Sequence, residues 1–174
     1  DYSWKTGLLI MGASVAQLHW DGGAEGPDAS ALQYDFVVGG RQYIGKHDYF
    51  AWNVSYGKGS GENIMAFAGS NANAVIDVDG KLETLPAYAL LLGYMHDWGD
   101  KFSSNLSYAY GWLETPESRD PLALKQGGIL HVNLIYRPIK YFSCGIEYMY
   151  GGQQATNGAI GVANRLQTMV KFEY

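Results

Sequence analysis

The chain has 174 residues and a formal charge of −5, and it holds no block of basic residues, so nucleic acid is not an expected partner. Its single cysteine, Cys144, excludes an internal disulfide and a cysteine-based zinc cluster. No run of eighteen apolar residues occurs, which excludes a transmembrane helix. The 14 tyrosines, 5 tryptophans and 23 glycines instead favour many strands with aromatic belts and small residues on one face.

The first predicted strand covers residues 2–20. Trp4, Leu8, Leu18 and Trp20 lie an even number of residues apart, so in one continuous strand they share a face. Tryptophan at both ends of an apolar face is typical of the two interfacial belts of a membrane protein. We therefore expect this face of the strand to be the apolar, outward one.

The same alternation continues along the chain. In residues 49–58, for example, Phe50, Trp52 and Val54 oppose Asn53 and Ser55. A period of two with one apolar face indicates a half-buried strand. Six further strands are predicted in this way, at residues 31–44, 49–58, 85–98, 102–113, 126–137 and 141–153.

The last strand, residues 164–174, alternates without a break. Leu166, Val170 and Phe172 share one face, and Arg165 and Lys171 share the other. The predicted strand runs to the last residue and ends on an aromatic side chain. Its free edge is expected to pair with another strand, because unpaired strand edges favour aggregation in water and do not occur in lipid.

The connections alternate in length. Long polar segments at 21–30, 59–84, 114–125 and 154–163 alternate with short turns at 45–48, 99–101 and 138–140. Long loops at one end and short turns at the other are typical of outer-membrane barrels. The sequence therefore predicts an all-β fold: a single-domain, transmembrane, antiparallel up-and-down β-barrel with about eight strands. Its C-terminus would be periplasmic, in the outer membrane of a Gram-negative bacterium.

The polar faces distinguish this barrel from a water-soluble one. A soluble barrel turns its large apolar side chains inward and has a solvated outside rich in Lys and Glu. Here the faces that oppose the apolar ones consist of Ser, Asn, Gly and Ala with a few scattered charges. A small and weakly charged face is typical of a lumen, which favours the membrane interpretation.

Four sequence blocks carry a resemblance to a known family. They are Leu-Glu-Thr-Leu-Pro-Ala-Tyr at 82–88, Val-Asn-Leu-Ile-Tyr-Arg-Pro at 132–138, Gly-Ile-Glu-Tyr-Met-Tyr-Gly at 145–151 and Ala-Asn-Arg-Leu-Gln at 163–167. With these blocks the stretch 59–174 resembles the C-terminal part of DcaP-like porins. The first strands match that family only in pattern.

The resemblance implies a fold and a function. DcaP-like porins are outer-membrane porins that form trimers of 16-stranded barrels, so the eight strands would be the C-terminal half of a barrel. The implied function is a passive diffusion channel for small hydrophilic solutes, with a preference for small organic anions such as dicarboxylates. The implied partners are the lipid bilayer, lipopolysaccharide and a homotrimer. No enzyme activity, cofactor or metal is expected.

The candidate pore-lining residues lie on the polar faces of the predicted strands. Lumen arginines and lysines attract small anions and bind carboxylates, whereas the same residues near a rim would only pair with nearby acids. His131 and Glu147 lie near mid-height and form either a constriction or a plain hydrogen-bond network. The candidates are Arg41, His131, Asn133, Arg137, Glu147, Arg165 and Lys171.

Two alternatives remain open from the sequence. Eight strands can close by themselves, and such a barrel is filled by side chains and has no channel. It would serve as an anchor or as an adhesion surface through its loops. The long segment 59–84 would either fold into a pore as a constriction or reach a neighbouring subunit.

Overall fold

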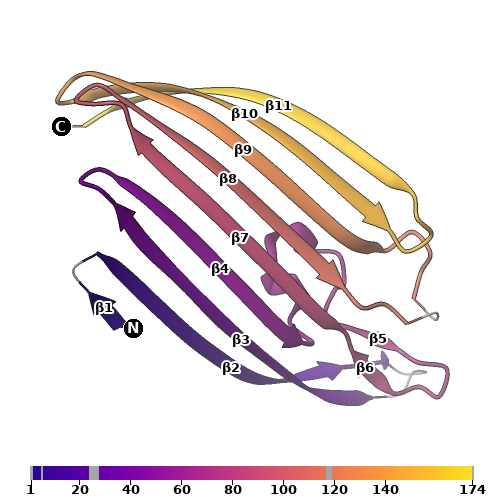
Figure 1. The fold of residues 1–174 in the computed structure, drawn as a ribbon. Helices are drawn as coiled ribbons and strands as arrows, with labels where there is room; N and C mark the ends of the chain where they lie inside the picture. The colour runs from indigo at the N-terminus through magenta and orange to yellow at the C-terminus, as the bar shows by residue number, and fades with distance from the viewer. Residues whose placement is uncertain (1, 5, 24–27, 117–118, 174) are drawn as a thin grey trace.

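The computed structural model describes residues 2–4, 6–23, 28–116 and 119–173. They form one nine-stranded sheet in which every strand pairs antiparallel with its neighbour, in the order β1-β2-β3-β4-β7-β8-β9-β10-β11 (Figure 1). Its strands are β1 (Tyr2–Trp4), β2 (Gly7–Trp20), β3 (Ala29–Ile44), β4 (Asp48–Lys58), β7 (Pro86–Asp97), β8 (Phe102–Leu113), β9 (Leu124–Ile139), β10 (Phe142–Ala155) and β11 (Ile160–Phe172).

The longest connection, between β4 and β7, carries structure of its own. It contains two 3-10 turns, η2 (Gly61–Asn63) and η3 (Met65–Phe67), and a small hairpin of β5 (Ala74–Ile76) and β6 (Leu82–Thr84). The sequence predicted this whole segment to be irregular. No helix in the described part of the chain is long and apolar enough to cross a membrane.

The two faces of the sheet differ sharply. On one face a register row across β7, β8 and β9 consists of Ala89, Gly111 and Gly127. On the other face the next row of those strands consists of Leu90 and Tyr110, with Gly128 beside them. Small residues therefore cover one face, and large apolar residues cover most of the other.

The sheet is curved, and the small-residue face is its inside. A single hollow on that face is lined by residues of β4, such as Asn53, and also by residues of β11, such as Ala163. These strands are five positions apart in the sheet, so only a curved sheet brings them to one hollow. We call this the inner face and the opposite one the outer face. Within the described residues, β1 and β11 do not pair with each other, so the sheet is open and is not the closed eight-stranded barrel of the alternative expectation.

The prediction of one strand over residues 2–20 was wrong. The chain reverses before Gly7, and β1 pairs antiparallel with the start of β2, with Trp4 opposite Gly7. Trp4 and Trp20 therefore lie on different strands. Pairing with β3 also places Leu8 opposite Arg41 and Leu18 opposite Ala31, on the inner face rather than the outer one. Both faces of this strand are apolar, so its alternation could not determine which face is outward.

Other boundaries differ by a few residues. The last loop, predicted at 154–163, is a tight turn between Ala155 and Ile160, in which Gly158 adopts a φ of +85° that only glycine tolerates easily. β9 is longer at both ends than predicted. The short turns between β3 and β4, between β7 and β8 and between β9 and β10 lie at one end of the sheet, where both chain termini also lie (Figure 1).

The register of β2 can be tested with paired cysteines. Met11 and Val38 lie directly opposite each other on the outer face, where Cβ atoms are about 5 Å apart. In a Cys144→Ser background, Met11→Cys with Val38→Cys should form an intramolecular disulfide on mild oxidation, detected by mass spectrometry of the denatured chain. Ile10→Cys with Val38→Cys should not, because these side chains point to opposite faces. The reverse result would contradict the observed register.

Candidate functional site

A polar network crosses the inner face at mid-height. Glu147 accepts hydrogen bonds from Asn133 Nδ2 at 3.1 Å and from Gln167 Nε2 at 2.8 Å. His131 Nδ1 lies 3.3 Å from the same carboxylate, and Asn105 Nδ2 donates to Asn133 Oδ1 at 3.0 Å. The network forms because these residues sit in adjacent register rows of β8 to β11. It joins His131 and Glu147, which the sequence placed near each other, with the candidate Asn133, and it adds Asn105 and Gln167, two amides that sequence reasoning did not single out.

Two of the predicted basic residues meet at the short-turn end. Arg137 Nη1 donates to Ser103 Oγ at 2.7 Å, and Lys171 forms an ion pair with Glu173. Arg137, Lys171 and Glu173 line one hollow of about 400 Å³ on the inner face. Lys140 lines it as well, so the hollow holds three cations and one carboxylate, which leaves an excess of positive charge.

The other two arginines lie far from this hollow and from each other. The guanidinium of Arg41 on β3 sits over the ring of Tyr49, with Cζ 4.5 Å from the ring centroid. Arg165 on β11 lies opposite Met149. Both arginines belong to one register row that runs across the inner face, Arg41–Ala51–Gly93–Ser107–His131–Met149–Arg165. Small residues in the middle of the row leave the space between its two ends open.

The segment between β4 and β7 folds over the inner face. Phe67 is fully buried in a small core with Ala72, Ala87 and Leu113. Phe67 can pack in this position only because residue 111 is a glycine: a Cβ there would lie 2.8 Å from the Phe67 ring. Of the two placements that the sequence left open for residues 59–84, the structure has the segment packed on its own sheet.

A buried arginine in the loop between β8 and β9 contacts the same segment. Arg119 is only 5% exposed and donates from Nη2 to the carbonyl of Ser70 at 3.3 Å. Burial lowers the pKa of its guanidinium from the usual value. The amide of Glu62 also donates to the side chain of Asn73 at 2.9 Å. Sequence reasoning missed Phe67 and Arg119, although the row Ala89–Gly111–Gly127 was a signal that something packs there.

A hollow of about 620 Å³ lies between this segment and the sheet, toward the long-loop end. Among the described residues that line it, the polar side chains are amides, a serine and a tyrosine, and none is charged. The inner face thus has an uncharged region under the segment and basic residues nearer the short-turn end.

The fold is similar to that of a solved channel. Over 99% of its length the chain matches the crystal structure of the outer membrane channel DcaP of Acinetobacter baumannii, with a TM-score of 0.73 and 20% sequence identity. The match covers 55% of that chain, so this chain spans about half its length. No family model matches the sequence, and no curated protein matches it. The all-β porin-barrel fold and the structural likeness to DcaP that the sequence predicted are confirmed.

The packing of Phe67 against Gly111 can be tested by adding a side chain at residue 111. Gly111→Val should displace the segment, because overpacking costs about 1–3 kcal/mol. We expect the amides of Phe67 and Ser70 to exchange hydrogen roughly 10- to 100-fold faster. Gly93→Val is the matched control, since a Cβ at Gly93 meets only Ser107 at 3.9 Å. Unchanged exchange in Gly111→Val would mean that the contact does not hold the segment.

Proposed function

We propose that the protein is an outer-membrane porin, a passive diffusion channel for small hydrophilic solutes that prefers small organic anions. It would act as part of a homotrimer with its C-terminus in the periplasm. One observation carries the proposal: a curved sheet, similar in fold to a channel, has a small polar inner face and an apolar outer face. An apolar outside is stable in lipid, and a polar inside of this curvature holds water.

The charges of the inner face support the preference for anions. The inner-face carboxylates all have partners: Glu147 is occupied by the amides of its network, and Glu173 pairs with Lys171. Asp35 accepts a hydrogen bond from Ser14, and Asp97 lies 3.7 Å from His47. Arg41 and Arg165 make no ion pair with a carboxylate in the described part of the chain. Two unpaired guanidinium groups at the ends of one row would attract carboxylates from either side of a lumen.

The uncharged hollow supports a small organic solute rather than a bare ion. Its lining combines alanines and glycines with the amides of Asn53, Asn63 and Gln153. Such a surface contacts a short carbon chain and donates hydrogen bonds to its polar ends. Basic residues below the hollow would then receive the carboxylate.

Ion selectivity in a planar bilayer tests the charge argument. Arg165→Glu should shift the reversal potential in a salt gradient toward cation selectivity, because it exchanges an unpaired positive charge for a negative one at the lumen. The shift should shrink as ionic strength rises, since salt screens the charge.

Lys46→Glu is the matched control for that experiment. It makes the same change of charge on the short turn between β3 and β4, away from the inner face. Equal shifts in the two variants, or none in Arg165→Glu, would remove Arg165 from the conduction path.

The ion pair of Lys171 and Glu173 at the short-turn end predicts that anion selectivity depends on pH. The hydrogen bond and charge of Lys171 hold the pKa of the Glu173 carboxylate below its usual range. The pair is intact above that pKa, and as pH falls through it Glu173 is neutralised and Lys171 is left unpaired. Anion selectivity should therefore rise below the ordinary glutamate pKa of about 4.3. Glu173→Gln should raise anion selectivity at neutral pH, and the rise in anion selectivity at low pH should be smaller in this variant. If selectivity depended on pH in the same way in the variant and in the unmodified protein, the pairing of Lys171 with Glu173 would be contradicted.

A further inference from the structure

Arg165 lies within reach of a carboxylate with which it does not pair. On the inner face Glu147 lies opposite Gln167, and Met149 lies opposite Arg165. Glu147 and Arg165 are therefore diagonal neighbours on adjacent strands, with Cβ atoms less than about 8 Å apart, a distance that long side chains span. An arginine and a carboxylate that meet form strong, charge-assisted hydrogen bonds. In the described part of the chain, however, the basic side chain that contacts Glu147 is His131, and Arg165 contacts no carboxylate.

Neutral amides occupy both oxygens of that carboxylate. Gln167 Nε2 donates to Glu147 Oε1 at 2.8 Å, and Asn133 Nδ2 donates to Glu147 Oε2 at 3.1 Å. Asn105 donates from its backbone N–H and from Nδ2 to Asn133 Oδ1, at 3.1 and 3.0 Å. Because these bonds fix the oxygen of the Asn133 amide, its nitrogen faces Glu147. The Glu147 side chain is only 20% exposed, so these amides rather than water supply most of its hydrogen bonds.

We propose that Gln167 and Asn133 act as positioning residues that hold the carboxylate of Glu147 away from Arg165 and so keep that guanidinium free for a passing anion. A largely buried carboxylate that loses a hydrogen-bond donor needs a new partner, because an unsatisfied charged group is costly. Arg165 can reach it from the adjacent strand and supplies two donors at once. The exposed guanidinium would then be lost to anions, although the net charge of the lumen stays the same. The inference rests on the proposed function, in which Arg165 attracts anions, and it adds two uncharged residues to those that determine selectivity.

A double-mutant cycle in a planar bilayer tests this role. Gln167→Leu removes the donor to Glu147 and changes neither the charge nor much of the size of the side chain. It should lower anion selectivity at neutral pH by at least about half of the loss that Arg165→Gln causes, because the freed carboxylate pairs with Arg165. In a Glu147→Gln background, Gln167→Leu should have no further effect on selectivity, since no carboxylate remains to pair. An equal fall in both backgrounds, no fall in either, or a rise because His131 takes up a proton instead, would overturn the proposal.

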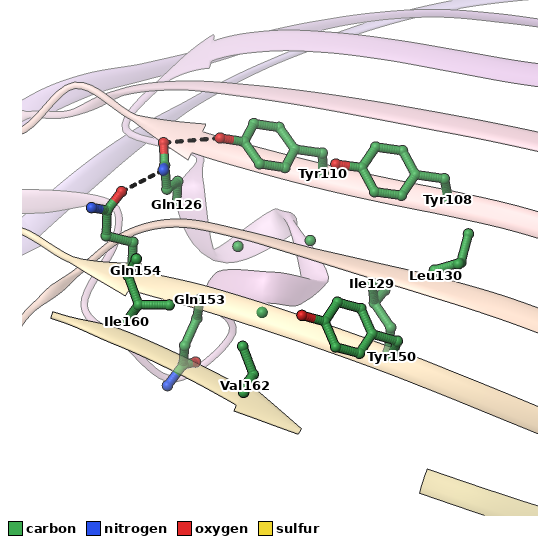
Figure 2. A pocket seen from close by; sticks show the side chains of 13 residues that line it. Tyr108, Tyr110, Gln126, Ile129, Leu130, Tyr150, Gln153, Gln154, Ile160 and Val162 are labelled. Carbon is green, nitrogen blue, oxygen red and sulfur yellow. Dashed lines mark hydrogen bonds between the residues drawn. The ribbon is translucent and has the colours of Figure 1, made fainter. Parts of the chain in front are cut away.

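Gln154→Leu is the matched control, on the outer face of β10. Figure 2 shows that Gln154 also belongs to a chain of hydrogen bonds, in which Tyr110 donates to Gln126 at 2.9 Å and Gln126 donates to Gln154 at 2.5 Å. Among the described residues, no carboxylate takes part in that chain. We therefore expect the ion selectivity of Gln154→Leu to match that of the unmodified protein. A fall equal to that of Gln167→Leu would mean that the loss of any such glutamine disturbs the pore, and it would overturn the proposal.

Chemical modification of Arg165 tests the pairing without conduction. Phenylglyoxal reacts with free guanidinium groups, and mass spectrometry of the peptide that contains Arg165 gives the rate of modification in outer membranes. We expect this rate to be about tenfold lower in Gln167→Leu than in the unmodified protein, and to be restored when Glu147→Gln is added. Equal rates in Gln167→Leu and in the unmodified protein would overturn the proposal. Slower modification together with no effect of Arg165→Gln on selectivity would confirm the positioning role and count against the proposed function.

Discussion

The continuous antiparallel register from β2 to β11 is the constraint on which the rest of the structure depends. Because side chains alternate between faces, one register assignment decides for every strand which residues are inside and which are outside. It brings Asn133 and Glu147 together, and it sets Arg41 and Arg165 at the two ends of one row. It also places two glycines, Gly128 and Gly152, side by side on the outer face.

The segment between β4 and β7 packs on the curved inner face and forms a hollow of about 620 Å³ with the sheet. Its seat depends on one missing side chain, at Gly111, which receives Phe67, and on Arg119, which reaches it from the following loop. The chemistry of the inner face therefore differs between its two ends. Shape and amides dominate toward the long loops, and positive charge dominates toward the short turns. The solute that we propose, a small organic anion, fits that order.

Sequence patterns predicted the strands well where their two faces differ in chemistry. β10 alternates Ile146, Tyr148 and Tyr150 with Glu147 and glycines, so its phase was clear. β2 is apolar on both faces, and only pairing with β3 settles its phase. His131 and Glu147 were predicted to be neighbours because their strands are adjacent. The contact of Phe67 with Gly111 joins residues far apart in the chain, and no local pattern encodes it.

The central claim is that the inner face lines water and the outer face does not. The most direct test is to replace residues 145–153 of β10 one at a time by cysteine, in a Cys144→Ser background, and to label the protein in membranes with a small, membrane-impermeant thiol reagent. The account predicts labelling at the odd positions, which include 145, 147 and 151, and protection at the even ones. Labelling at the even positions with protection at the odd ones would mean a water-soluble barrel with an apolar interior, and would contradict the account.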